Sequence, residues 1–270
     1  MSNTEKVLSV EEREAVKALL FQLADDDFLF SYRASEWLGL APHIEEDVAS
    51  SSITQDTMGH SAMYYMLLEN LGAGKADDLA HLRPAEERRN SVLTERVNGE
   101  GYYMDTPQYD WAYTVVRSYF YTQAKKVKID SLRNSSYEPL AEVAIKVNME
   151  IYYHLMHWRV WFEQLLSSTE DAKVRMTDAI KLVMADFGDV FSYGDQKEAI
   201  ERFDIIATEE DLEENWILAI TPMFEKLGND LPVVPKNAER NGRNGEHTRD
   251  LVEAIATLSE VYRMDLSASW

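Results

Sequence analysis

Apolar residues recur three or four positions apart through four long stretches of the chain, which is the period of a helix buried on one face. In the first stretch Leu20, Leu23 and Phe30 keep this spacing, and Gly39 and Pro42 follow as stop signals. Glycine and proline are scarce inside the stretches and gather between them. The pattern predicts four long helices, over about 10–39, 45–71, 108–133 and 138–166.

The connection between the second and third predicted helices is long and rich in charge and turn residues, with the runs GAGKADDLAHLRPAEERRN and NGEG. Such a connection suits a four-helix bundle with a crossover better than one built from tight hairpins. Three shorter helices are predicted over about 172–187, 209–227 and 248–263. A single strand-like run, LPVVP, is bounded by prolines that argue against a central strand. We therefore expect one all-α domain, a ferritin-like four-helix bundle over about 10–168 with additional C-terminal helices over about 170–266.

Composition and charge exclude several classes of function. The chain has 48 acidic and 27 basic residues, a formal net charge of −21, and 45% apolar residues. It is too apolar to be disordered and too acidic to follow a nucleic-acid backbone. With no cysteine, it has no disulfide, thiolate metal site or cysteine nucleophile. The N-terminus lacks the apolar run of a signal peptide, and no later segment is long and apolar enough to span a bilayer. We expect a cytoplasmic protein with neither a nucleic-acid nor a membrane partner.

Each predicted long helix also turns a polar residue inward near its middle. These inward polar positions are Asp27, Thr57 with His60, Thr122, and His154. A polar group on an apolar stripe needs a partner or a function. One such residue on each of four helices matches the layout of a carboxylate-bridged di-iron bundle.

The ligand set of such a bundle is incomplete here. A Glu-x-x-His pair on the second and fourth helices would need glutamates at positions 57 and 151, which hold Thr57 and Ile151. Thr122 stands where the third helix would supply its carboxylate. The ligand types that remain are Asp27, His60 and His154. Two ferrous ions would lack the bridging anions that offset their charge, so the sequence predicts a degenerate site.

Two nearby acids leave an alternative open. Asp56 and Glu150 each stand four residues before a histidine, His60 and His154 respectively, and a carboxylate at that spacing can hydrogen-bond an imidazole. We expect them to form acid–imidazole pairs inside the bundle. In the alternative, Asp27, His60 and His154 hold a metal that Asp56 or Glu150 completes.

Other polar and sulfur-containing residues near the site receive simpler interpretations. Asp25 and Asp26 are predicted to be solvated neighbours of Asp27, and His157 a surface or interface histidine. Five dispersed methionines are expected to fill the core flexibly: Met58, Met63, Met66, Met149 and Met156.

Several motifs carry a resemblance to a known family. These are SEWLGLAP, QDTMGH, EIYYHLMHWRVWFEQL, NGEHT and the terminal Trp270. Over nearly its whole length the chain resembles the A and C subunits of bacterial phenylacetyl-CoA ring-epoxidases, the multicomponent di-iron oxygenases of phenylacetate catabolism. By similarity, six positions correspond to the iron ligands of the family: Asp27, Thr57, His60, Thr122, Ile151 and His154. Three of them hold residues that are not ligands, and this implies the non-catalytic C type of subunit. The resemblance implies that this chain binds no cofactor and that iron is held by the homologous A subunit. It also implies a heterotetramer or larger complex, with electrons from a flavin and iron–sulfur reductase and phenylacetyl-CoA as the substrate of the complex.

A basic, glycine-rich segment before the last predicted helix, PKNAERNGRNGEHTR, could contact the phosphates of the coenzyme A ester. Its cationic side chains are Lys236, Arg240, Arg243 and Arg249. The alternative is a solvated loop with incidental charge, in which Thr248 caps the last helix. Tyrosines and a tryptophan crowd residues 102–121, and we expect some of these rings to serve a subunit interface and others the core.

Three functional hypotheses follow. The favoured one is a non-catalytic subunit that supports a di-iron oxygenase and shapes its substrate path. The second is a metal-binding oxygenase-type enzyme that uses Asp27, His60 and His154. The third is a free-standing helical bundle, which would explain the stripes but not the resemblance.

Overall fold

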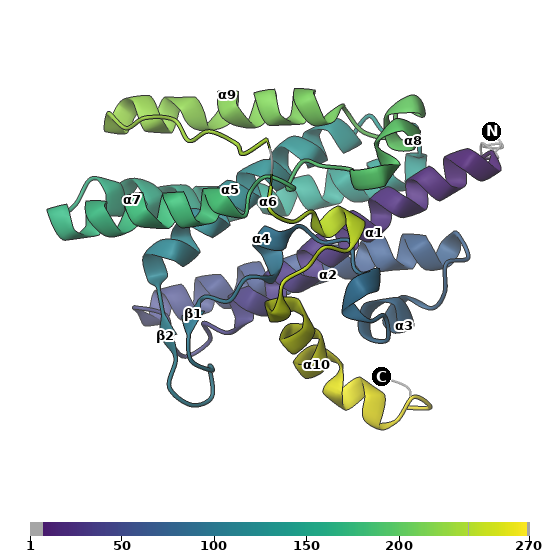
Figure 1. Cartoon of the computed structure of the whole chain (residues 1–270), viewed down its shortest axis with the longest axis horizontal. Helices are drawn as coiled ribbons and strands as arrows, with labels where there is room; N and C mark the ends of the chain where they lie inside the picture. Colours follow the sequence, from purple (N-terminus) through teal and green to yellow (C-terminus); the bar gives the residue numbers. More distant parts are fainter. Residues whose placement is uncertain (1–7, 237, 269–270) are drawn as a thin grey trace.

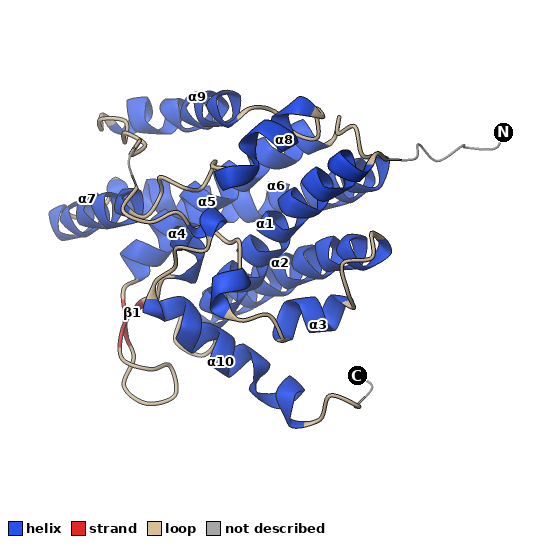
Figure 2. Ribbon diagram, turned by 45° about the vertical axis from the view of Figure 1, so that its right-hand side comes forward, coloured by secondary structure: helices blue, strands red, loops and turns tan. Residues whose placement is uncertain are grey.

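The computed structural model describes residues 8–236 and 238–268 and is helical almost throughout (Figure 1, Figure 2). The four predicted long helices are present as α1 (Val10–Ser35), α2 (Ile44–Asn70), α5 (Trp111–Leu132) and α6 (Glu138–Leu166). The predicted all-α class is confirmed. Trp270, which contributed to the resemblance, lies outside the described residues. Among the residues described, no helix combines the length and apolarity that crossing a membrane requires.

The long helices form two pairs, α1 with α2 and α5 with α6, and α2 also lies against α6 (Figure 1). The long connection 71–110 links the pairs, as the ferritin-like arrangement requires. Three predicted C-terminal helices are also present, as α7 (Glu170–Ala185), α9 (Glu209–Leu227) and α10 (Arg249–Met264). Both α7 and α9 pack on α5, whereas α10 extends on the opposite side of the molecule, near α3 (Ala76–His81).

Several short elements were not predicted. They are α3, η1 (Ala85–Glu87), α4 (Val92–Glu95), η2 (Gly194–Gln196), α8 (Lys197–Arg202), η3 (Gly242–Asn244) and the antiparallel strands β1 (Gly99–Glu100) and β2 (Gln108–Tyr109). Each has six residues or fewer, so the sequence contains too few positions in each element for a periodic pattern to be recognised. The LPVVP run forms neither helix nor strand.

Helix ends follow local chemistry. The Thr208 hydroxyl accepts a hydrogen bond from the Asp211 amide at the start of α9, and Gly228 ends this helix with a left-handed φ of 66°. Thr248 occupies the N-cap position of α10, but its hydroxyl donates to Glu95 Oε1 at 2.8 Å and does not accept from the helix.

Helix α5 lies at the centre of the core. It is buried on nearly every side because α6, α7 and α9 all pack against it. Tyr113, Tyr119 and Tyr121 are therefore buried within this chain's own fold, so of the two roles expected for these rings, these three belong to the core. Tyr102, on the loop between β1 and β2, is about half exposed.

Candidate functional site

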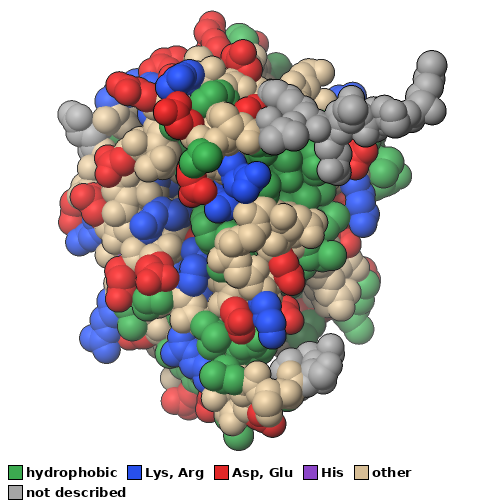
Figure 3. Space-filling model, turned by 90° about the vertical axis from the view of Figure 1, so that its right-hand side faces the viewer, with side chains coloured by type: hydrophobic (Ala, Val, Ile, Leu, Met, Phe, Trp, Pro, Cys, Tyr) green, Lys and Arg blue, Asp and Glu red, His purple; other side chains and the backbone are tan. Residues whose placement is uncertain are grey.

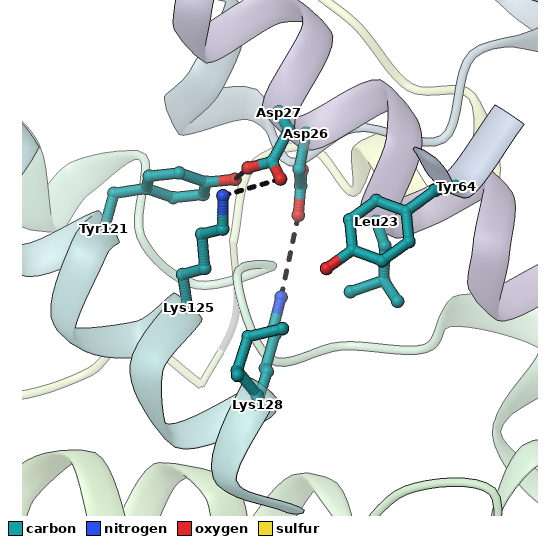
Figure 4. A pocket seen from close by; sticks show the side chains of 8 residues that line it. Leu23, Asp26, Asp27, Tyr64, Tyr121, Lys125 and Lys128 are labelled. Carbon is teal, nitrogen blue, oxygen red and sulfur yellow. Dashed lines mark hydrogen bonds and ion pairs between the residues drawn. The ribbon is translucent and has the colours of Figure 1, made fainter. Parts of the chain in front are cut away.

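Inward polar residues of two helices, Asp27 of α1 and His60 of α2, converge on the ammonium group of Lys125 on a third helix, α5. Lys125 Nζ of α5 donates to Asp27 Oδ2 of α1 at 2.6 Å and to His60 Nδ1 of α2 at 2.8 Å. The Tyr121 hydroxyl donates to the other carboxylate oxygen of Asp27 at 2.9 Å, and Figure 4 shows both α5 side chains pointing at this aspartate. Lys125 thus lies between the carboxylate and one of the imidazoles that the sequence predicts at ligand positions of a di-iron bundle.

The two histidines pair with acids of the opposite helix. His60 Nε2 lies 2.6 Å from Glu150 Oε2, and His154 Nε2 lies 3.0 Å from Asp56 Oδ2. Acid–imidazole pairs form inside the bundle as expected, but the partners differ: each histidine pairs with the acid of the other helix and not with the acid four residues before it. The reason is the helix contact: α2 and α6 run antiparallel, so residue 56 faces residue 154 and residue 60 faces residue 150.

Burial sets the charge state of this cluster. The pKa of His60 is lowered by burial and by the positive charge of Lys125, so its ring is neutral. A neutral ring can donate through Nε2 to Glu150 while Nδ1 accepts from Lys125. Burial raises the pKa of Asp27 and lowers the pKa of Lys125. The Lys125 charge partly offsets the rise for Asp27, and the Asp27 charge partly offsets the fall for Lys125.

These residues do not fit a di-iron centre. The Thr57 hydroxyl donates to the Ile53 carbonyl oxygen at 2.7 Å within its own helix, and Ile151 is fully buried in the core. Neither side chain can replace a bridging carboxylate, and Lys125 places a positive charge where a metal would need to bind. In the described part of the chain, no three histidine, aspartate or glutamate side chains converge as metal ligands would.

A small cavity of about 10 Å³ adjoins the cluster, lined by Asp26, Tyr64 and Lys128 among others (Figure 4). This is room for about one water molecule. The Tyr64 hydroxyl is buried and has no hydrogen-bond partner among the described residues. A single water molecule in the cavity could form a hydrogen bond with it. The bundle centre offers no space for an organic substrate.

Asp25 is buried rather than solvated, so its predicted exposure is wrong. Its carboxylate forms ion pairs with Arg83 and with Arg88, and it accepts from the Tyr65 hydroxyl at 2.5 Å. Burial alone would raise the pKa of Asp25, but the charges of Arg83 and Arg88 lower it to about 2.

Asp26 is buried as well, and it pairs with Arg243, one of the residues predicted to contact a phosphate. Arg243 donates to both oxygens of Asp26, at 2.9 and 2.8 Å, and is almost fully buried. The prediction that Arg243 is free to contact a phosphate is therefore wrong. The other three cations of the segment each pair with a carboxylate: Lys236 with Glu213, Arg240 with Glu239, and Arg249 with Glu253. A phosphate contact for these three stays a prediction.

Comparison with known proteins shows the family of this chain. The sequence profile of the family described as "Phenylacetic acid catabolic protein" matches residues 1–270. The chain belongs to this family. It is similar to the C subunit of the 1,2-phenylacetyl-CoA epoxidase of Escherichia coli (strain K12), with 26% identity over 255 residues, which cover 94% of this chain and 98% of that protein.

In this member of the phenylacetic acid catabolic family, sequence reasoning missed Lys125. A signal was present, since Lys125 follows Thr122 by three residues and so shares its inward side of α5. The apolar stripes predict which positions would lack metal ligands, but they do not predict the contacts of Lys125.

The periphery of the site also differs from expectation. His157 Nε2 lies 3.1 Å from Glu46 Oε2 of α2, so this histidine belongs to the contact between α2 and α6. The methionines divide into two groups: Met58 and Met63 pack against the core, whereas Met66, Met149 and Met156 are more than half exposed. Core filling is therefore the wrong interpretation for the last three.

Proposed function

We propose that this chain is a non-catalytic, structural and substrate-shaping subunit of a cytoplasmic di-iron oxygenase that epoxidises the ring of phenylacetyl-CoA. The observation that carries the proposal is the position of Lys125, whose ammonium group contacts both Asp27 and His60. The full-length similarity to the C subunit of a phenylacetyl-CoA epoxidase supports it.

Lys125 explains how the bundle can remain folded without metal. A buried aspartate needs a positive charge nearby, and in a metal centre the cation provides it. Here the ammonium group provides that charge and holds Asp27 and His60 in place. The crossed pairs His60–Glu150 and His154–Asp56 then tie α2 to α6 as ligands of a shared metal would.

The oxygen chemistry is assigned to a partner. We propose a complex, a heterotetramer or larger, with a homologous subunit that holds the iron and at whose site phenylacetyl-CoA reacts. A cavity of about 10 Å³ at the centre of this bundle is too small for a phenyl ring, which supports a role for this chain outside the reacting centre.

Metal analysis of the purified chain tests the proposal. We expect no stoichiometric iron in this chain, either alone or after separation from a reconstituted complex. About one or two irons per chain, lost in His60→Gln and His154→Gln variants, would overturn the proposal in favour of a metal-binding enzyme that uses Asp27, His60 and His154.

Turnover by the reconstituted complex gives an independent test. We expect His154→Gln to leave the rate of epoxidation within about twofold of wild type, because His154 touches no reacting atom under the proposal. As a matched control, the equivalent histidine of the iron-containing subunit is replaced, which should abolish turnover. A loss of comparable size from His154→Gln, with the complex still assembled, would contradict the non-catalytic role.

A further inference from the structure

The outward sides of α2 and α6 are unusually poor in charge for this chain. Between Asp47 and Glu69 the only charged residue is Asp56, and between Lys146 and Arg159 it is Glu150. Both of these acids are hydrogen-bonded to a histidine of the other helix. Elsewhere the surface mixes acidic, basic and apolar side chains closely, as Figure 3 shows for the end of the molecule where α1 begins.

The exposed positions on these two helices form what we call the α2/α6 face. On α2 they recur at helical spacing and are uncharged, and all but Gln55 are small or apolar: Val48, Ser52, Gln55, Gly59, Ala62 and Met66. On α6 the uncharged ones are apolar or aromatic, Ile145, Met149, Tyr152, Tyr153, Met156 and Val160, and the exposed cations Lys146 and Arg159 stand near the two ends of this stretch. All six of the α6 side chains are more than half exposed. Contiguous apolar surface of this kind marks an interaction site, and methionines suit an adaptable one.

The two stripes lie side by side. The contacts of His60 with Glu150, of Asp56 with His154, and of Glu46 with His157 fix α2 and α6 as antiparallel neighbours. The stretch 48–66 of α2 therefore lies along the stretch 145–160 of α6. At 1.5 Å per residue the face is about 28 Å long, and two adjacent helices give it an area on the order of 500 Å². That is enough for the centre of a standard interface, which buries about 800 Å² on each partner.

Gly59 is a second, independent sign of a close neighbour. It stands in the middle of α2, is exposed, and a Cβ atom added to it would meet no atom within 4 Å. Glycine inside a helix is unfavourable relative to alanine, and nothing in this chain's described structure needs the space. A helix of another chain that packs across Gly59 would need it.

Charge identifies the kind of partner. At one end of the face, where α2 ends and α6 begins, exposed acids gather as Glu69, Glu138 and Glu142, with Lys146 as the nearest exposed cation on α6. A second copy would bring two chains of formal charge −21 together. A partner with an apolar helix pair and a basic rim at this end would meet no such repulsion.

We infer that the α2/α6 face is the docking surface for the iron-containing helical subunit, which would present an apolar helix pair with a basic rim. This inference rests on the proposed function. Docking would also cover Asp56 and Glu150, whose side chains are 44% and 38% exposed, and would close the crossed histidine pairs off from water. Because both acids already accept hydrogen bonds from histidines, covering them costs less than burying bare carboxylates.

The test measures the affinity of the full chain for the co-expressed iron-containing subunit. We expect Met149→Glu and Tyr153→Glu each to raise Kd at least 30-fold, and Gly59→Leu at least tenfold, since each places charge or bulk in the contact. The matched control is Leu182→Glu on α7, an apolar side chain of similar exposure outside the face, which should change Kd less than threefold. Circular dichroism and thermal melting of each variant check that its fold is unchanged.

The outcomes separate this inference from the proposed function. If the face variants bind like wild type while the iron-free chain still supports turnover, the docking surface is wrong and the function stands. Stoichiometric iron in this chain would overturn the function instead. If the chain alone sediments as a dimer that Met149→Glu dissociates, the face is a contact between copies and the proposed partner is wrong.

Discussion

A single ammonium group, that of Lys125, balances the buried charge of Asp27 and occupies an acceptor of His60. Replacing it with methionine keeps most of the side-chain volume but leaves the carboxylate buried without its cation. Removing one partner of a buried pair costs about 3–5 kcal/mol. We expect Lys125→Met to lower the free energy of unfolding by that amount in urea denaturation at pH 7.

The double variant Asp27→Asn/Lys125→Met is the control. It removes both charges, and replacing a whole buried pair by neutral side chains is often tolerated. We expect it to recover most of the loss. If the double variant were no more stable than Lys125→Met, the ion pair would not explain the effect.

Acid should weaken the fold through the buried histidines. Burial lowers the pKa of His60, His154 and His157, so the folded chain keeps these rings neutral while the unfolded chain protonates them near pH 6.5. Their contribution to stability is complete above that pH and is lost as the pH falls below it, by up to about 1.4 kcal/mol per pH unit for each histidine. Urea denaturation at pH 7.5 and 5.5 would measure the loss.

Two variants assign this pH dependence. His60→Gln should make it shallower, because one proton-binding difference is removed. His247 acts in the opposite sense: burial alone would lower its pKa, but the contact with Glu95 raises it, so its contribution is present at low pH and lost as the pH rises. His247→Gln should therefore make the loss of stability in acid steeper. Equal slopes for wild type and His60→Gln would contradict the assignment.

At the residue scale, the sequence could predict that Asp27, His60 and His154 turn inward, because the helical period places all three on the apolar sides of their helices. It could not predict that His60 pairs with Glu150 rather than Asp56, since the partner depends on how α2 is aligned with α6. The contacts of Lys125 were equally out of reach, because its long side chain can turn toward several neighbours.

At the element scale, the consecutive acids Asp25 and Asp26 attach two distant segments to α1. Asp25 binds the arginines of the 83–89 connection, and Asp26 binds Arg243. Arg243→Ala should therefore leave Asp26 without its main partner and lower the free energy of unfolding by about 3–5 kcal/mol. It should also expose residues 238–248 to proteolysis, measured by limited trypsin digestion.

Arg240→Ala is the matched control for Arg243. Its guanidinium is exposed and pairs only with the adjacent Glu239 in the described structure, so we expect a change within about 0.5 kcal/mol. Equal effects of the two substitutions would show that the buried pair does not anchor this segment.

Gly59 offers a prediction of the opposite sign. Alanine at this exposed helical position meets no atom within 4 Å, so Gly59→Ala should stabilise the isolated chain by about 1 kcal/mol through helix propensity. Differential scanning calorimetry would measure the rise in Tm. Gly99→Ala is the contrast, because its Cβ would lie 2.3 Å from the Gln108 carbonyl oxygen, and it should destabilise. A lower Tm for Gly59→Ala would contradict the account of this position.

The long helices were predictable because each repeats its apolar pattern over several turns, as α6 does from Leu140 to Leu166. The 71–110 connection was not, because α3 and α4 have too few residues for a period and are held by tertiary contacts. Val92 and Asn90, for example, are buried, although the sequence of this segment indicated only a long connection rich in charge and turn residues.

At the scale of the whole molecule, charge and apolar surface are separated. The chain has a formal charge of −21, but the central part of its α2/α6 face carries only Asp56 and Glu150, each paired with a histidine, and the exposed cations Lys146 and Arg159 stand near its two ends. Self-repulsion of this size favours separate copies in solution, whereas the apolar face favours a contact with a partner of different charge. Together, the net charge and the apolar face favour binding to a different protein over binding to a second copy. This preference does not require an ion pair at the centre of the interface.

This separation predicts how salt affects assembly with the iron-containing subunit. Charges at the rim steer the encounter and are screened beyond about 10 Å at 0.1 M salt, whereas contacts at an apolar centre depend little on ionic strength. We expect the association rate constant to fall about tenfold between 50 and 500 mM NaCl while the dissociation rate constant changes less than about twofold. Surface plasmon resonance on the full chain would measure both. Glu138→Gln/Glu142→Gln should flatten the salt dependence of association and leave dissociation unchanged, because these acids lie at the end of the face and not at its centre. If salt instead accelerates dissociation tenfold, the complex is held by ion pairs, and the apolar face is not its main contact.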